Sequence, residues 1–377
     1  MKKVMIGMSG GVDSTAATII LMKDGYEVAG ATMILTDSMF VASSEAKAIC
    51  DKLGIKHYEF DMREAFQTRV REYFARSYYE GFTPNPCVVC NREFKFGDFL
   101  KKAIELGYDY IATGHYCNLR NDEKGVHLLC GNDKKDQSYF LCNVKKESLE
   151  HVVFPINAYE KSEVRSLVGS VLGLEKESKK KDSQDICFVK DYMDELKRYT
   201  ANEAEKEALT YRDWCKEQEV GDFVLEGNAI GKHQGYVKYT VGQRHGMGLS
   251  YSEPLYVLGT QPESNQVVVG TSDKLFARGL QFERINVIND DAFAQAIETK
   301  QLTGKVRFGK KKYKIESIEK QVQKQEQELE LVPGEYWQVF FEEEIRAITP
   351  GQYIALYYGD ECVGGGRITN TVKEDLS

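Results

Sequence analysis

Short apolar runs alternate with amphipathic stretches over the first third of the chain. Val4–Met8 and Val28–Leu35 are apolar runs of strand length, whereas Val12–Lys23 has apolar residues at helical spacing and is followed by Gly25. The alternation continues with predicted helices at Ser43–Leu53, Arg63–Tyr79 and Arg92–Leu106 and predicted strands at His57–Asp61 and Tyr110–Thr113. Alternating strands and helices predict a doubly wound α/β fold with a parallel sheet covered on both faces.

The pattern changes further along the chain. Residues 136–198 are predicted to be mostly helical, and beyond about residue 220 short alternating runs are separated by Gly, Asn and Ser turns. The pattern predicts small β domains, the last a β-barrel. We expect an α/β domain at 1–200, a central β domain at 205–280 and a barrel domain at 281–377. The predicted strands are Tyr236–Val241, Pro254–Gly259, Gln266–Gly270, Lys305–Phe308, Lys312–Ile318, Glu335–Phe341, Tyr353–Tyr358 and Cys362–Gly364.

Composition narrows the class of protein. A chain of 377 residues is too long for one ordinary domain, and no apolar run approaches the roughly 18 residues that span a bilayer. Nine cysteines form an odd set without a secretory signal, which predicts reduced thiols and a cytoplasmic protein with no membrane partner. The net charge of −8 gives no general attraction to nucleic acid, but local basic patches still permit RNA binding.

The first chemical signal is the loop Ser9-Gly10-Gly11-Val12-Asp13-Ser14, between the first predicted strand and helix. Glycines there let backbone N–H groups approach an anion, the helix N-terminus adds positive potential, and Asp13 is a candidate metal ligand. No Gly-Lys-Ser/Thr follows, so this is not the loop used for γ-phosphate transfer. The loop resembles the signature of ATP pyrophosphatases, which cleave ATP between the α- and β-phosphates; the alternative is a structural glycine turn.

Cysteines supply the second signal. Thr83–Asn91 holds two prolines and is predicted to be an irregular loop, with Cys90 near the N-terminus of the next helix, where the dipole lowers a thiol pKa. Cys187 follows the triple lysine Lys179–Lys181, which favours a thiolate or persulfide in the same way. Two such thiols beside an adenylating loop fit sulfur transfer. Cys87-Xaa-Xaa-Cys90 alone is also half of a zinc site, although no second pair completes it.

Further motifs accompany these two signals in a fixed order along the chain. They are Gly7–Ser14, Thr83–Asn91, Thr113–Tyr116, Lys135–Leu141, Lys181–Phe188, Tyr239–Arg244 and Thr349–Gln352. On these motifs the chain resembles the bacterial tRNA-specific 2-thiouridylases, the MnmA type, over nearly its full length. The resemblance implies that the first domain is the ATP pyrophosphatase catalytic domain, with a helical segment that contacts tRNA, and that the barrel binds tRNA.

The implied reaction is thiolation of carbon 2 of the wobble uridine of tRNA. ATP and Mg²⁺ would adenylate the C2 oxygen, and sulfur would arrive as a persulfide on Cys187. Cys90 matches the family nucleophile that attacks this persulfide and leaves a Cys90–Cys187 disulfide. The implied partners are tRNA and a persulfide-donating sulfur carrier protein or cysteine desulfurase.

The resemblance also implies roles for single residues, with Cys90, Cys187 and Asp13 as the catalytic set and no dedicated protein metal site. The implied ATP contacts are Gly7, Met8, Ser9, Gly10, Gly11, Val12, Asp13, Ser14, Met33 and Gly114. The implied target-base loop is Asn85, Pro86 and Cys87, and the implied tRNA contacts are His115, Lys135, Asp136, Gln137, Arg307, Phe308 and Gln352. Cys87 departs from the family, which usually has Asp there.

A basic strip in the C-terminal region supports RNA binding independently of the resemblance. Lys305–Lys314 holds interleaved aromatic residues and no acid, so that it can neutralise phosphates while rings stack on bases. Taken alone, such a strip is more often a solvated face.

Two other functions stay open at this point. One is an amide-forming adenylating ligase, which needs the first loop but neither Cys90 nor Cys187. The other is a non-enzymatic RNA-binding protein built on a degenerate nucleotide fold.

Overall fold

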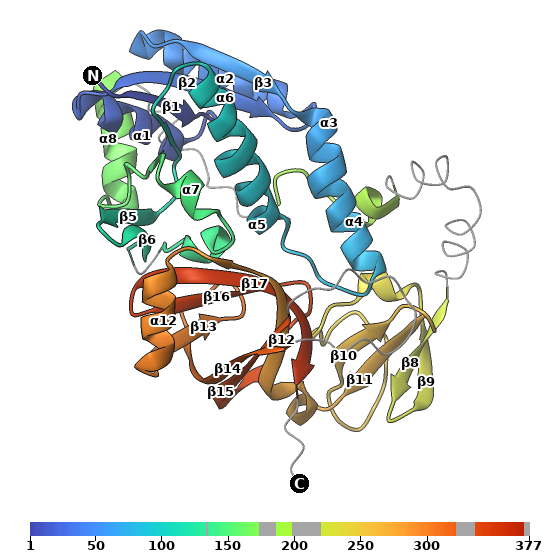
Figure 1. The fold of residues 1–377 in the computed structure, drawn as a ribbon. Helices are drawn as coiled ribbons and strands as arrows, with labels where there is room; N and C mark the ends of the chain where they lie inside the picture. The colour runs from blue at the N-terminus through green and yellow to red at the C-terminus, as the bar shows by residue number, and fades with distance from the viewer. Residues whose placement is uncertain (133–134, 173–185, 198–219, 322–335, 373–377) are drawn as a thin grey trace.

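The computed structural model describes residues 1–132, 135–172, 186–197, 220–321 and 336–372. A parallel sheet with its helices lies at one end of the molecule, and two β structures lie side by side at the other end (Figure 1). The predicted Lys179–Lys181 run lies outside the described residues.

The parallel sheet has the strand order β3-β2-β1-β4-β7. Its strands are β1 (Lys3–Gly7), β2 (Glu27–Ile34), β3 (His57–Asp61), β4 (Tyr110–Ala112) and β7 (Val152–Val153). Strand β1 is buried on both faces, because Met5 belongs to one apolar core whereas Val4 and Ile6 belong to the other. The predicted doubly wound α/β fold is confirmed, although β7 falls in a segment that we expected to be helical.

Helices cover both faces of this sheet. Helices α1, α2 and α8 supply buried residues to the core that contains Val4 and Ile6, and α6 supplies Phe99 and Ala103 to the core that contains Met5. The helices are α1 (Val12–Lys23), α2 (Met39–Leu53), α3 (Arg63–Phe66), the π-helix η1 (Gln67–Arg71), α4 (Glu72–Tyr79), α5 (Pro86–Cys90), the π-helix η2 (Asn91–Asp98), α6 (Phe99–Glu105), the 3₁₀-helix η3 (Ser138–Leu141), α7 (Lys146–Leu149) and α8 (Lys161–Leu172).

The C-terminal region is a closed barrel, as predicted. Its six strands follow the order β12-β15-β14-β13-β16-β17, and β12 pairs with β17 to close the sheet. The strands are β12 (Phe276–Val287), β13 (Leu302–Lys305), β14 (Tyr313–Gln321), β15 (Tyr336–Arg346), β16 (Tyr353–Tyr358) and β17 (Glu361–Val372), with α12 (Asp290–Glu298) beside them. A hairpin from the first domain, β5 (Cys117–Asp122) and β6 (Gly125–Cys130), extends the barrel sheet through β17.

The central β structure has the strand order β10-β11-β8-β9. Its elements are β8 (Gly221–Leu225), β9 (Asn228–His233), the 3₁₀-helix η4 (Tyr236–Lys238), β10 (Tyr256–Gln261), β11 (Gln266–Gly270) and the 3₁₀-helix η5 (Ser272–Leu275).

Two strand predictions are wrong, and one hairpin was not predicted. Tyr236–Val241 is not a strand, because Tyr236 and Val237 enter the core around Phe74 through the short helix η4. The predicted strand Lys305–Phe308 ends at its first residue, since β13 stops at Lys305. Residues 117–130, for which we predicted no element, form the β5–β6 hairpin, so the helical segment that follows is tied to the barrel.

His127 joins this hairpin to the barrel. Its Nδ1 lies 2.9 Å from Glu361 Oε1, and its Nε2 lies 3.0 Å from Asp122 Oδ1. Burial lowers the pKa of the imidazole, but the bonds to two carboxylates outweigh that effect and hold the pKa above its ordinary value. The histidine is therefore bound more tightly when it is charged.

Stability should consequently depend on pH around neutrality. Because the His127 pKa is higher in the folded than in the unfolded chain, its contribution is complete below about pH 6.5 and is lost as the pH rises through the folded value. We expect the free energy of unfolding to fall as the pH rises above about 6.5 and through the folded pKa. Urea unfolding at several pH values tests this, and the slope should be shallower in His127→Gln. An equal slope in both proteins would contradict the assignment.

Candidate active site

The Gly-rich loop lies at the carboxyl end of β1, where ligands bind in open α/β sheets. Gly10 has a φ of +67°, and a Cβ there would lie 3.1 Å from Glu45 Oε2, so the backbone needs glycine. The Ser14 hydroxyl donates to the Gly11 carbonyl at 3.2 Å. Gly11 caps α1 without a side-chain hydrogen bond, which leaves the first N–H groups of the helix available to an anion.

Asp13 is fixed at the mouth of this loop by two other segments. Lys161 Nζ, at the start of α8, donates to both Asp13 carboxylate oxygens at 2.6 and 2.7 Å, and the Tyr116 hydroxyl donates to Oδ1 at 3.0 Å. A Cβ on Gly114 would lie 3.0 Å from the Asp13 Cβ, so the Thr113–Tyr116 motif approaches the loop closely. The sequence did not indicate Lys161.

The other predicted nucleotide contacts flank the loop. Met33 lies near the carboxyl end of β2, and Gly114 follows β4. Because β1 pairs with both β2 and β4, the two residues lie on opposite sides of the loop. The structure therefore brings the predicted ATP contacts to one edge of the sheet.

The predicted target-base loop opens a helix. Asn85 is the N-cap of α5, Pro86 is its first residue, and Cys87 and Cys90 both lie inside the helix. The expectation of an irregular loop up to Asn91 is wrong, because proline is well accommodated in the first turn of a helix, where its missing N–H has no partner to lose.

The barrel holds this loop in place. Gln352 Nε2 donates to the Thr83 carbonyl at 2.8 Å and to the Pro84 carbonyl at 3.3 Å, and the Thr83 N–H donates to the Pro350 carbonyl at 2.9 Å. Gly351 makes the approach possible, because its φ is +93° and a Cβ would lie 2.8 Å from both the Thr83 nitrogen and oxygen. The Thr349–Gln352 motif thus positions the segment before Cys90.

Replacing Gly351 by alanine should separate the barrel from this loop. A side chain at a positive φ combined with a backbone clash should lower the free energy of unfolding by about 2–4 kcal/mol. Gly359→Ala is the matched control, since Gly359 also has a positive φ (+57°) but a Cβ there would meet nothing within 4 Å. Urea unfolding measures both variants; equal losses would show that the contact with Thr83 does not matter.

The two predicted reactive thiols lie in one region of the molecule. Cys90 is buried, and its apolar cluster includes Phe66 and Phe188, the residue after Cys187. Cys187 itself is exposed, and both cysteines are free thiols. Burial raises the pKa of the Cys90 thiol to about 12, against the lowering effect of Lys95, and the Cys187 and Cys87 sulfurs raise it further. The expectation of a lowered Cys90 pKa is wrong for this state, because desolvation outweighs the positive charge.

Lys95 is the shared cation of this region, and sequence reasoning missed it. Burial raises the pKa of the Cys87 thiol, and nearby protein atoms also raise that of the Cys187 thiol although the residue is exposed on one side. The Lys95 ammonium opposes the rise at both. Burial also holds the pKa of His115 well below its ordinary value, and Lys95 lowers it further. One ammonium therefore acts on three thiols and one imidazole.

Comparison with known proteins agrees with this geometry. Residues 2–191 match the family model described as the HUP domain of tRNA methyl transferases, residues 215–271 match the corresponding PRC-barrel domain, and residues 278–368 match an aminomethyltransferase β-barrel domain. A tRNA-specific 2-thiouridylase of Clostridioides difficile (strain 630) is 38% identical over 388 residues, which cover 98% of this chain and 99% of that protein. A 2-thiouridylase of Syntrophomonas wolfei is 38% identical, with 97% and 99% covered. The chain belongs to the tRNA-specific 2-thiouridylase family.

The remaining residues that the 2-thiouridylase resemblance assigns to tRNA contacts have partners inside the protein. His115 Nδ1 lies 2.7 Å from Thr113 Oγ1. Lys135 Nζ lies 5.1 Å from the centre of the Tyr116 ring, and Gln137 Oε1 accepts from the Tyr116 N–H at 3.0 Å. These residues shape the end of β4 in this structure, and their contact with tRNA stays a prediction.

Asp136 connects the first domain to the barrel. Its Oδ2 accepts from Lys305 Nζ at 2.7 Å, and its Oδ1 accepts from the Ser138 N–H at 3.0 Å. Desolvation raises the pKa of this carboxyl, but the Lys305 and Ser138 bonds prevail and leave the pKa below its ordinary value. In this structure the Asp136 carboxylate is therefore charged and joins the first domain to the barrel.

Several lysines of the basic strip Lys305–Lys314 form ion pairs within the protein, which the sequence of the strip does not indicate. Lys305 is nearly buried against Asp136, Lys311 pairs with Glu343 at 2.8 Å, and Lys314 pairs with Glu342. Glu342 and Glu343 lie on the neighbouring strand β15, so the absence of acid within the strip does not leave its lysines unopposed.

Arg307 and Phe308 lie in the turn after β13. Arg307 donates to the Ala347 carbonyl at 3.0 Å. Phe308 is exposed, and its ring centre lies 4.7 Å from that of Phe140. This exposed ring is the part of the strip best suited to stacking on a base.

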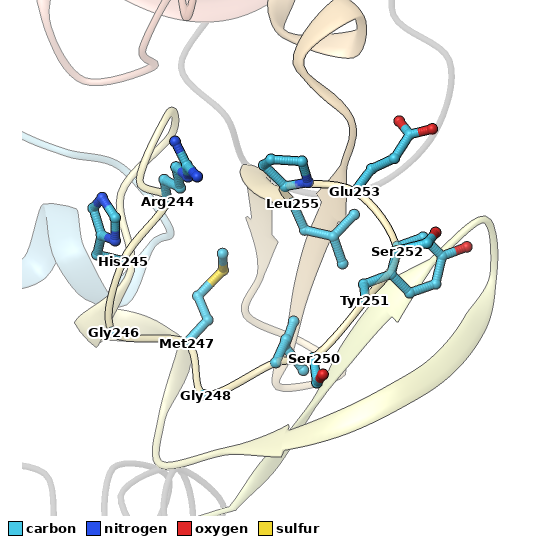
Figure 2. A pocket seen from close by; sticks show the side chains of 12 residues that line it. Arg244, His245, Gly246, Met247, Gly248, Ser250, Tyr251, Ser252, Glu253 and Leu255 are labelled. Carbon is cyan, nitrogen blue, oxygen red and sulfur yellow. The ribbon is translucent and has the colours of Figure 1, made fainter.

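The described part of the structure has two notable cavities outside the Gly-rich loop. One, of about 1020 Å³, has Phe188 in its wall, together with the ends of β2 and β3 and the segment that follows Cys187. The other, of about 540 Å³, is enclosed by the loop Arg244–Leu255 of the central β structure (Figure 2). Arg244 of the Tyr239–Arg244 motif lines the second cavity, but none of the predicted site residues does.

No helix in the described part of the chain is long and apolar enough to cross a membrane.

Proposed function

We propose that this chain replaces oxygen by sulfur at carbon 2 of the wobble uridine of tRNA, in an ATP-dependent reaction. Its relatives at 38% identity are named tRNA-specific 2-thiouridylases. The observation that carries the proposal is that Cys90, at the end of the helix that begins at the target-base loop, shares an apolar cluster with Phe188, the residue after Cys187. An amide-forming ligase would use the Gly-rich loop but has no need of these thiols.

The Gly-rich loop is suited to hold the phosphates of ATP as the second substrate. The N–H groups at the start of α1 and the Ser9 hydroxyl offer donors to an anion, and the Ser14 hydroxyl would join them by turning away from the Gly11 carbonyl. Adenylation of the uridine C2 oxygen gives AMP as the leaving group and releases pyrophosphate. Mg²⁺ would neutralise charge on the phosphates, and nucleotide sites bind it through one or two carboxylates plus phosphates. The Asp13 carboxylate is already engaged at both oxygens by Lys161, so it would have to give up part of that pairing to become a ligand.

Sulfur transfer would follow at the two cysteines. Cys187 carries the persulfide, and the Cys90 thiolate attacks the inner sulfur of Cys187. A Cys90–Cys187 disulfide forms while hydrosulfide leaves. Hydrosulfide then attacks C2 and displaces AMP. The raised pKa of Cys90 keeps this thiol mostly protonated in the present structure, and the Lys95 ammonium is the charge that favours its thiolate.

The partner that loads Cys187 is a persulfide-donating carrier protein or cysteine desulfurase. The exposure of Cys187 supports direct delivery, because a protein-bound persulfide has to reach the accepting thiol. Because tRNA is the second partner, we place the reaction in the cytoplasm.

Nucleoside mass spectrometry tests the proposal. Unmodified tRNA is incubated with the protein, ATP, Mg²⁺ and a persulfide donor, then digested, and we expect 2-thiouridine at the wobble position only when ATP is present. The family model names methyl transfer instead. A methylated nucleoside, or unmodified tRNA from folded protein that binds it, would overturn the proposal.

A further inference from the structure

A third thiol lies next to the two that the proposed function uses. Cys87 precedes Cys90 by one helical turn on α5. Residues three apart on an α-helix lie on the same face, with Cα atoms about 5 Å apart. That separation falls within the range of roughly 4.4–6.8 Å that a disulfide spans.

The three sulfurs influence one another. The pKa of Cys90 is raised by burial, and the Cys187 and Cys87 sulfurs each add to the rise. Burial likewise raises the pKa of Cys187, and Cys87 adds to it. Lys95 acts on all three in the opposite direction. Each thiol of the set is therefore within electrostatic range of the other two.

The three thiols differ in how far they are exposed to solvent. Cys90 is buried, with 8% of its surface exposed, whereas Cys87 is partly exposed. A disulfide between Cys90 and Cys187 occupies the exposed thiol that must accept the next persulfide. A disulfide between Cys87 and Cys90 leaves Cys187 free and still presents the partly exposed Cys87 sulfur to a reductant.

We propose that Cys87 is a resolving thiol that regenerates Cys187 after each turnover by thiol–disulfide exchange within the site. The inference rests on the proposed function, which supplies the Cys90–Cys187 disulfide. The Cys87 thiolate attacks the Cys90 sulfur, the Cys87–Cys90 bond forms, the Cys90–Cys187 bond breaks, and Cys187 leaves as a thiolate. No net oxidation occurs, and the proton released by Cys87 balances the one that Cys187 takes up.

The direction of attack follows from the leaving groups. Attack on the Cys187 sulfur would expel Cys90, whose thiol pKa is raised to about 12, and a thiolate of high pKa leaves slowly. Attack on the Cys90 sulfur expels the exposed Cys187, which can receive the next persulfide at once. An external dithiol then reduces the Cys87–Cys90 bridge by two electrons and is itself oxidised to a disulfide.

A disulfide map after one turnover tests this exchange. Protein carrying the Cys187 persulfide is mixed with tRNA, ATP and Mg²⁺ without reductant, free thiols are alkylated at once, and non-reduced peptides are analysed by mass spectrometry. In the unaltered protein we expect the Cys87–Cys90 bridge and an alkylated Cys187. In Cys87→Ser we expect the Cys90–Cys187 bridge. Cys87→Asp, which introduces the residue usual in the family, should give the same map as Cys87→Ser and guards against misfolding of one variant.

A second arm keeps the test separate from the proposed function. The reduced protein is oxidised by a diazene without tRNA or ATP, and the same map is taken after equilibration, so that the preferred bridge among the three thiols is known even if no tRNA is thiolated. Predominant Cys87–Cys90 bridging supports the proposal, whereas a persistent Cys90–Cys187 bridge with Cys87 alkylated overturns it. Cys50→Ala, which removes a buried thiol of α2, should leave the map of the unaltered protein unchanged. Failure of the first arm alone would count against the proposed function.

Discussion

Replacing either Cys90 or Cys187 by serine should abolish 2-thiouridine formation while pyrophosphate release that depends on tRNA stays measurable. Loss of a nucleophile typically costs on the order of a thousandfold or more in turnover. The Gly-rich loop and Asp13 lie on other elements, so the ATP half of the reaction does not need the thiols. Thiolated nucleoside and pyrophosphate are measured in the same reaction mixture.

The matched control for these variants is Cys50→Ala. Cys50 is also a buried thiol, and burial raises its pKa to about 11, but it lies on α2 in the other apolar core. It should change stability without removing thiolation. An enzyme that forms amides would tolerate all three substitutions, so retained product in Cys90→Ser or Cys187→Ser would exclude sulfur transfer through these residues.

The sequence predicted the parts of the site that depend on the order of elements. A Gly-rich loop between a strand and a helix has to lie at the carboxyl edge of a parallel sheet, and motifs that follow β4 reach the same edge. The closed barrel followed from alternating runs between turn residues. The domain boundaries at 200, 205 and 281 and the roles of the single site residues stay predictions.

What the sequence missed depends on contacts between distant segments. Cys90 and Lys95 would point about 140° apart on an α-helix, but η2 is a π-helix, whose wider turn changes that register. Cys90 is buried in an apolar cluster with phenylalanines from four different segments, which no local motif reveals. Lys311 and Lys314 of the basic strip find their acids on β15.

Lys161 also could not be predicted from the sequence, because its contact with Asp13 joins two distant segments. Its replacement should strongly reduce pyrophosphate release. Its ammonium contacts both Asp13 oxygens, with 14% of the Lys161 side chain and 30% of the Asp13 side chain exposed. Lys161→Met leaves the carboxylate without this partner beside the nucleotide loop. We expect pyrophosphate release to fall by about a hundredfold to a thousandfold, as when one preorganised charged donor is removed from a site. The free energy of unfolding should also fall, by about 1–3 kcal/mol.

Lys161→Arg separates the two effects, because it keeps the charge but replaces a compact ammonium by a planar fork. It should restore most of the stability and only part of the rate, whereas a purely structural lysine would recover both together. The double variant Asp13→Asn/Lys161→Met removes both charges, so its stability should exceed that of Lys161→Met, since no partly buried carboxylate is left unpaired. Urea unfolding and pyrophosphate release on these proteins and on the single variant Asp13→Asn decide the matter, because additive losses in the double variant would mean that the two side chains do not act as a pair.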